Sequence, residues 1–339
     1  MIYLAMFLTG LIAGRLAVVL SCWFLNDETT VQPARLGIAR CAKCEQSLSA
    51  AAIQFKGLMK SRVICPGCRN SGPVWPSLVS AVTAIIFAGF TWLLIEGNCQ
   101  TITEVRPSHQ LVFDRLPFQL IFIFLMLVVT VTDLIDYAIP DFIIWIGIVV
   151  AVAGSTASGD LQMVHIWVDW SYELVEIYGP WLPEWMKHHQ HLHGAAWSIA
   201  GLVTGAGIML LIRIISSVIL GQAAVGFGDV TLMMMIGAFM GWQPTLCVIA
   251  IAPIGGLLMG LFSQIAFARS FVAFGPYLTF SAFIVLCTWR ILWEVLQLRI
   301  IFSHWPTVLS LVVGVLLMLS IMLGLLRLFK AVPASALKR

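Results

Sequence analysis

The hydrophobic residues of this chain gather into nine long runs, separated by short polar or mixed stretches. The runs cover residues 2–25, 74–95, 118–134, 139–154, 195–220, 230–241, 246–268, 272–295 and 307–328. About 20 consecutive apolar residues are enough for one helix to cross the hydrocarbon core of a bilayer. The pattern predicts an all-α polytopic membrane protein with about nine transmembrane helices, of which the fourth and sixth are the shortest.

The composition agrees with that prediction. Hydrophobic residues make up 60% of the chain and charged residues only 10%, whereas about a quarter of a soluble domain is charged. The first run is long enough to span and no small-residue cleavage site follows it, so we expect a retained helix and not a signal peptide. The basic residues are few and lie beside the membrane, so we expect the lipid bilayer as a partner and no nucleic acid.

The distribution of Lys and Arg predicts the orientation, because cytoplasmic loops of membrane proteins carry an excess of both. The first loop, residues 26–73, holds seven of these residues, and the C-terminal end of the chain holds four more: Arg327, Lys330, Lys338 and Arg339. Nine crossings place this loop and the tail on the same side. We therefore expect an inner-membrane protein whose first loop and C-terminus are cytoplasmic. The segment 155–194 is acidic and rich in Trp and Tyr, so we expect interfacial helices on the outer surface.

The runs divide the chain into five parts. They are a first transmembrane helix (1–25), a cytoplasmic loop (26–73), a second helix with an external loop (74–116), a group of helices with the candidate active site and the external segment (117–300), and an additional C-terminal helix with a basic tail (301–339).

Two Cys-x-x-Cys pairs lie in the first loop, where Cys41 and Cys44 precede Cys65 and Cys68. Pairs at this spacing are typical of a structural zinc site with four thiolate ligands. A cytoplasmic loop keeps thiols reduced, which favours metal over the alternative of a disulfide or free thiols. The sequence thus predicts a small zinc-binding loop domain without a catalytic role. The remaining cysteines have no such spacing and are expected to pack in or near the helices: Cys22, Cys99, Cys247 and Cys287.

Two acidic stretches stand at the ends of apolar runs. One runs from Thr132-Asp133 to Pro140-Asp141, and the other is Gly-Phe-Gly-Asp at 226–229. An ionisable carboxyl at membrane depth is costly and usually functional. With nine spans, Asp133 and Asp229 both fall at cytoplasmic helix ends. If the two carboxyls meet, they share one proton, and such a pair can activate water and protonate a leaving amine.

The neighbouring residues support this interpretation. Gly226 and Gly228 permit a tight backbone approach where a helix begins, and the helix dipole there favours a charge on Asp229. Pro140 suits the first turn of the next helix, which also holds Asp141.

Simpler interpretations of these acids remain open. Asp136 and Asp141 fit solvated or dipole-compensating turn residues. Asp133 fits a helix-end acid that reaches the interface, and Asp229 fits a plain N-cap. Four histidines at irregular spacing, on the side opposite to the acids, fit an exposed turn better than a metal site: His188, His189, His191 and His193.

Together these motifs resemble the bacterial type IV prepilin peptidases, membrane enzymes related to the GxGD aspartic peptidases. Asp133 is followed at seven residues by Pro and at eight by Asp, as in the family pattern. The GxGD motif at 226–229 is followed by Leu232 and by Gly237-Ala-Phe-Met-Gly241. Phe-Gly-Pro-Tyr-Leu at 274–278 is similar to a family motif, and so is the double Cys-x-x-Cys of the first loop.

The resemblance implies cleavage of the basic leader of prepilins or pseudopilins at the cytoplasmic face, with Asp133 and Asp229 as the catalytic pair. It also implies N-methylation of the new terminus with S-adenosylmethionine. The chain departs from the family at residues 14–19 and 76–80, which belong to the half linked to methylation, and the second of these stretches lacks the usual acid. The resemblance therefore supports the peptidase more than the methyltransferase.

Two other functions are compatible with buried acids. An ion- or proton-coupled transporter also places carboxyls in the membrane, but along a path at several depths. A homologue that binds pilins without cutting them would keep the same fold. Acids confined to two turns on one face favour the peptidase.

Overall fold

The computed structural model describes residues 1–27, 68, 75–105, 109–221, 225–267 and 274–331. Within these residues the structure is helical, apart from turns and an isolated β-bridge between Asp169 and Trp181. The long helices are α1 (Ile2–Asp27), α4 (Trp75–Ile95), α5 (His109–Asp136), α6 (Asp141–Ser158), α9 (Gln190–Leu220), α10 (Phe227–Met240), α11 (Trp242–Phe267), α12 (Gly275–Arg290) and α14 (Trp305–Ala331). The short ones are α7 (Val175–Tyr178), α8 (Glu184–His188), the π-turn η1 (Ile291–Val295) and α13 (Leu298–Ser303).

Each of the nine apolar runs coincides with one long helix. Seven helices in the described part of the chain are long and apolar enough to cross a membrane, and α10 and Trp242–Gly256 of α11 are shorter apolar helices. The all-helical, multi-pass membrane architecture is thus confirmed, while nine complete crossings stay a prediction. With 14 residues, α10 is only about 21 Å long, less than the roughly 30 Å of hydrocarbon core.

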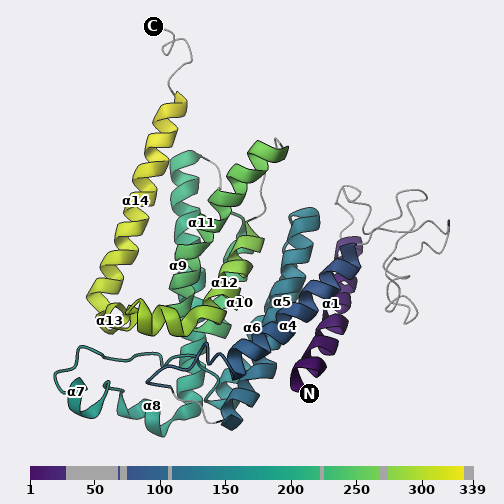
Figure 1. The fold of residues 1–339 in the computed structure, drawn as a ribbon. Coiled ribbons are helices and arrows are strands. Elements are labelled where there is room, and N and C mark those ends of the chain that lie inside the picture. The colour runs from purple at the N-terminus through teal and green to yellow at the C-terminus, as the bar shows by residue number, and fades with distance from the viewer. Residues whose placement is uncertain (28–67, 69–74, 106–108, 222–224, 268–273, 332–339) are drawn as a thin grey trace.

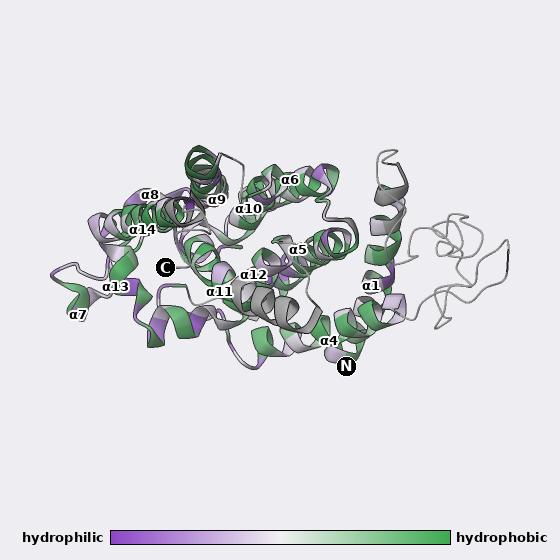
Figure 2. Ribbon diagram, turned by 90° about the horizontal axis from the view of Figure 1, so that it is seen from above, coloured by the Kyte–Doolittle hydropathy of each residue, from purple (hydrophilic) through white to green (hydrophobic). Residues whose placement is uncertain are grey.

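The long helices run up and down in one layered bundle (Figure 1). The start of α1 and the short helices α7 and α8 lie at the lower end in this view, and the end of α14 lies at the upper end. Seen from above, α1 and α4 form one side of the bundle, and α14 lies toward the other side (Figure 2). Hydrophobic residues dominate the long helices all round, as expected for helices surrounded by lipid and by one another.

Helix α10 is held against α9 by glycines that let the two backbones touch. A Cβ on Gly237 would collide with the carbonyl group of Gly201, and a Cβ on Gly205 would collide with that of Met233. Small residues commonly give membrane helices such close contacts. The same antiparallel register places Asp229 level with Met209. Helix α9 then continues for eleven residues to Leu220, a length of about 16 Å. The start of α10 therefore lies well inside the bundle, away from the end of α9.

The segment 159–189 is hydrogen-bonded to the lower end of the bundle, which is opposite to the end where α5 finishes. The Arg115 guanidinium donates two hydrogen bonds to the Asp160 carbonyl, both 3.3 Å. Trp242 Nε1 donates to the Ile166 carbonyl at 2.7 Å, and the indoles of Trp170 and Trp293 both donate to the Glu104 carboxylate. This segment therefore contributes to the core as well as to the surface, which goes beyond the surface helices expected from sequence.

Burial controls the ionisation of two groups in this region. Burial, assisted by the nearby Arg115, lowers the pKa of His165 to about 4. The imidazole is therefore neutral at pH 7, and no second positive charge accompanies Arg115 there. Burial raises the pKa of Glu104, although its two indole donors oppose the shift.

Candidate active site

Asp133 lies in the last turn of α5, with its side chain turned into the bundle. It is only 4% exposed, so it does not reach the interface as a solvated helix-end acid would. Among the described residues, no donor reaches its Oδ2 with good hydrogen-bond geometry, although the Gly275 backbone lies beside the carboxylate. The carboxylate faces the start of α12, where a Cβ on Gly275 would lie 2.5 Å from Oδ2. A buried carboxyl oxygen without a partner is costly unless it serves a reaction or binds a ligand.

Asp229 lies in the first turn of α10 and is 8% exposed. Its Oδ2 accepts a hydrogen bond from the Gly226 amide at 3.1 Å. Gly226 is the N-cap of α10 and Asp229 is the third helical residue, so Asp229 reaches back to the cap as in a capping box. It is therefore not a plain N-cap, and the capping bond uses one oxygen of the carboxylate.

The structure places the two acids in one region, with Ile139 of the α5–α6 turn beside Gly228, which precedes Asp229, and beside Gly275, which faces Asp133. Asp229 lies near enough for its charge to act on the Asp133 carboxyl. A Cβ on Gly228 would lie 3.1 Å from Ile139 Cβ, and one on Gly275 would lie 3.5 Å from Ile139 Cδ1. The starts of α10 and α12 and the end of α5 therefore meet around one side chain. Two carboxylates in such an apolar enclosure repel each other strongly unless one is protonated.

The turn between α5 and α6 is tightly built. Tyr137 adopts a left-handed conformation, with φ of 55°, and its amide donates to the Asp133 carbonyl at 3.0 Å. Pro140 caps α6 in an extended conformation, and Asp141 follows in the first helical turn. The side chain of Asp141 is exposed, as expected for a residue that compensates the helix dipole. The side chain of Asp136 lies outside the described residues.

Arg213 of α9 is a third charged residue at this site, one that the sequence pattern did not indicate. Its guanidinium interacts electrostatically with Asp229, and Nη1 donates to the Val225 carbonyl at 2.5 Å. The guanidinium carbon also lies 5.9 Å from the centre of the Phe227 ring. Arg213 therefore holds the backbone just before α10 through a hydrogen bond, and it places a positive charge near the Asp229 carboxyl.

The predicted zinc ligands Cys41, Cys44 and Cys65 lie outside the described residues, and Cys68 is half-buried. No group of three or more metal-ligating side chains occurs within the described parts of the chain. The zinc site stays a prediction. Cys99, Cys247 and Cys287 are buried or half-buried in the bundle, which fits a packing role.

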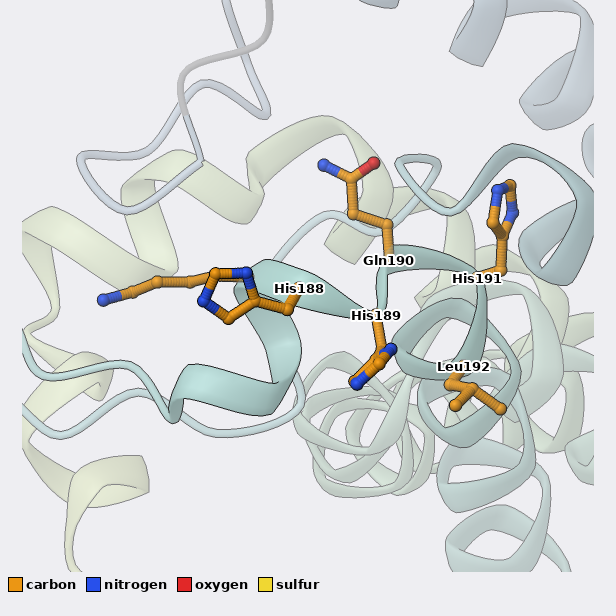
Figure 3. Close-up of a pocket in the computed structure, with 6 residues that line it drawn as sticks. His188, His189, Gln190, His191 and Leu192 are labelled. Carbon is orange, nitrogen blue, oxygen red and sulfur yellow. The ribbon is translucent and has the colours of Figure 1, made fainter.

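The histidines near residue 190 lie on two sides of the start of α9. His188, His189 and His191 line an open pocket of about 540 Å³, where their rings point in different directions (Figure 3). His193, expected in the exposed turn, is instead 1% exposed and its Nε2 accepts the Ile166 amide at 3.1 Å. The prediction was wrong for His193, because α9 begins at Gln190 and turns that ring inward.

Comparison with known proteins gives one distant relative. No family model matches the sequence, and no solved structure matches it. A stretch of 95 residues is 31% identical to the prepilin leader peptidase/N-methyltransferase of Escherichia coli (strain K12). The stretch covers 27% of this chain and 41% of that protein, so the match spans about two fifths of the curated relative. The chain is thus a multi-pass membrane protein distantly related to a prepilin leader peptidase.

Proposed function

We propose that the chain is an intramembrane aspartic endopeptidase, which removes the basic leader of type IV prepilins or pseudopilins at the cytoplasmic face of the inner membrane. The observation that carries the proposal is the burial of two interacting carboxyls, Asp133 and Asp229, at one end of an apolar bundle. The distant relative, a prepilin leader peptidase, supports the same reaction class. The specific substrate and the orientation belong to the proposal.

The two carboxyls have different surroundings, which suggests how they divide the chemistry. Asp229 accepts an amide hydrogen bond at the positive end of α10 and has Arg213 nearby. We assign it the ionised role, in which it takes a proton from the attacking water. Asp133 has an oxygen without a partner, and we assign it the shared proton. The water oxygen adds to the scissile carbonyl carbon while Asp133 protonates the carbonyl oxygen. The C–N bond then breaks as the leaving nitrogen receives the proton from Asp229, while one hydroxyl of the tetrahedral intermediate returns its proton to Asp133.

The interior of α10 argues against a transport path. Beyond Asp229 and Thr231, the buried side chains of this helix are apolar from Leu232 to Met240. The segment 159–189 covers the opposite end of the bundle, where Arg115 and Trp242 donate hydrogen bonds to its backbone carbonyls. A proton or cation path places ionisable groups at several depths, whereas Asp229 is the one ionisable residue of α10, so these features favour a reaction at one end over conduction across the bundle.

Reconstituted protein tests this function directly. Purified protein in liposomes is mixed with a prepilin that has a basic leader, and the products are identified by mass spectrometry. We expect the leader to be cut off after a Gly, with no proton flux across the vesicles. Proton flux together with an intact prepilin would support the transporter instead, and pilin binding with neither activity would support the non-cleaving homologue.

Arg213 offers a test of how Asp229 is positioned. We expect Arg213→Met to lower kcat by about a hundredfold, because a displaced reacting group can cost that much, while KM changes little. Arg213→Lys keeps the charge but loses the planar fork that reaches the Val225 carbonyl, so we expect a partial recovery. A variant that lost only thermal stability, with kcat unchanged in the folded fraction, would show that Arg213 is purely structural.

We also propose that Cys41, Cys44, Cys65 and Cys68 bind a structural zinc ion in the first loop. Four thiolates at this spacing are a complete tetrahedral donor set. Elemental analysis should find about one zinc ion per chain, which Cys41→Ser removes and Cys287→Ser leaves in place. Equal zinc content in both variants would contradict this assignment.

The proposal does not extend to methylation. The two stretches that depart from the family pattern lie on α1 and α4, which pack closely where a Cβ on Gly14 would lie 2.6 Å from Ser80 Cα. Arg15 donates to the Ser77 hydroxyl at 3.2 Å, and α4 contains no acidic residue. These two stretches offer no carboxylate for the hydroxyls or amine of S-adenosylmethionine, so methylation stays an expectation of the resemblance and we assign it no step.

A further inference from the structure

Two cysteines from distant parts of the chain lie close together in the bundle. Cys99 is in the loop that follows α4, and Cys287 is in the last turn of α12. Cys287 lies near enough for its charge, when it is ionised, to act on the Cys99 thiol. Both residues carry free thiols in the structure, and the proposed reaction uses neither of them.

Three backbone contacts hold the loop against the last turn of α12. The Arg290 amide donates to the Cys99 carbonyl at 2.8 Å. The Gln100 side chain donates to the Leu286 carbonyl at 3.0 Å, and the Cys99 sulfur lies 3.9 Å from that same carbonyl oxygen. Cys99 therefore contacts the helix one residue before Cys287 and three residues after it. A disulfide joins residues whose Cα atoms are about 4.4–6.8 Å apart, so it requires this kind of backbone contact.

The contact coincides with an irregularity in the helix. Directly after Arg290, the helix continues as the π-turn η1. A group that inserts into the hydrogen-bond ladder is a common cause of such distortions, and the Cys99 carbonyl is such a group because it accepts the Arg290 amide. Single π-turns are rare and often occur at functional positions. The helix therefore departs from regular geometry at the place where it holds the loop.

The two thiols lie on the side of the membrane where we expect oxidising conditions. Their loop shares its end of the bundle with the segment 159–189, since the Trp170 indole donates to the Glu104 carboxylate. The orientation proposed above places this segment outside. Disulfides form in the bacterial periplasm, whereas the cytoplasm keeps thiols reduced. The four cysteines of the first loop fall on the cytoplasmic side, where thiolates remain available for zinc.

We propose that Cys99 and Cys287 form a disulfide in the mature protein. This inference rests on the proposed orientation and not on the peptidase chemistry. The oxidant is a disulfide-bearing thiol oxidase of the external compartment. One cysteine thiolate attacks the oxidase disulfide and forms a mixed disulfide. The second thiolate then displaces the oxidase sulfur. The two thiols are oxidised, and the oxidase leaves as a dithiol that carries their two protons and two electrons.

Burial determines when the bond forms. Cys99 is 7% exposed, and burial, followed by the nearby Cys287, raises the pKa of its thiol to about 12. The thiolate is the form that attacks a disulfide, so exchange is slow once the loop has packed onto α12. Oxidation therefore takes place during folding, while the loop is still open to the oxidase. The packed bundle then protects the bond from reductants.

Peptide mapping of the full-length protein tests the proposal. Protein purified from bacterial inner membranes is alkylated with N-ethylmaleimide in denaturant, before any reductant is added, and then digested for mass spectrometry. We expect one pair of peptides linked through Cys99 and Cys287, which reduction separates, and an alkylated Cys247. Alkylation of both Cys99 and Cys287 in unreduced protein, or a bond from either of them to another cysteine, would overturn the proposal.

Thermal unfolding gives a second readout, with Cys247→Ser as the matched control. We expect a strong reductant to lower the unfolding temperature of the wild type and of the control by on the order of 5–10 °C. The same treatment should leave the unfolding temperature of Cys99→Ser unchanged, because this variant has no link to lose. An equal shift in Cys99→Ser would contradict the disulfide.

A cleavage assay on the same samples separates this inference from the proposed function. Protein that cuts a prepilin while Cys99 and Cys287 are both free would reject the disulfide and keep the peptidase. Protein that carries the link but cuts no prepilin would reject the peptidase and keep the disulfide.

Discussion

Asp133→Asn and Asp229→Asn are each expected to lower leader cleavage by at least about a thousandfold, because removal of one member of an acid–base pair leaves the water without activation or the leaving group without a proton. Asn preserves the volume of Asp, so the helices around both positions (α5 and α10) should keep their packing. The measurement is kcat with purified enzyme and prepilin, alongside thermal unfolding followed by circular dichroism.

Asp141→Asn is the matched control. Asp141 belongs to the same motif but its side chain is exposed at the start of α6. We expect kcat within a few-fold of wild type, in line with the small effects of most surface substitutions. If either buried acid tolerated replacement while Asp141 did not, the catalytic pair would have to be reassigned.

Gly275→Ala is expected to lower kcat by about a hundredfold, because small displacements of a catalytic group carry losses of that size. The new methyl group would lie 2.5 Å from Asp133 Oδ2 and 3.2 Å from its Cγ. Asp133 must then rotate away from its position, whereas the neighbouring backbone can stay where it is. The effect should appear in kcat more than in the unfolding temperature.

Gly207→Ala serves as the control for this substitution, since a Cβ at residue 207 meets no atom within 4 Å. It should retain full activity. A Gly275→Ala enzyme with normal kcat would mean that the carboxyl of Asp133 does not work from the position seen in the structure.

The periodicity of the sequence was enough to predict the helices, because the nine apolar runs are continuous and each ends at polar or turn-forming residues. It also indicated that Asp133 and Asp229 lie at one end of the bundle, since the expected orientation assigned them to the same face. The number of complete membrane crossings stays a prediction, because α10 has only 14 residues and is shorter than the hydrocarbon core.

Other features depend on contacts between distant residues, which no local pattern contains. A single Arg in an apolar run, such as Arg213, is typical of a side chain that reaches the interface, so its approach to Val225 and Asp229 was not foreseen. The burial of His193 depends on Ile166, 27 residues away.

The central claim is that Asp133 and Asp229 act on one water molecule between them. An experimental structure of the enzyme with a peptide that carries a central hydroxyl, an analogue of the tetrahedral transition state, tests it most directly. We predict that both carboxyls hydrogen-bond that one hydroxyl, each at about 2.5–3.0 Å. A bound hydroxyl that reaches only one of the two carboxyls, or neither, would contradict the account.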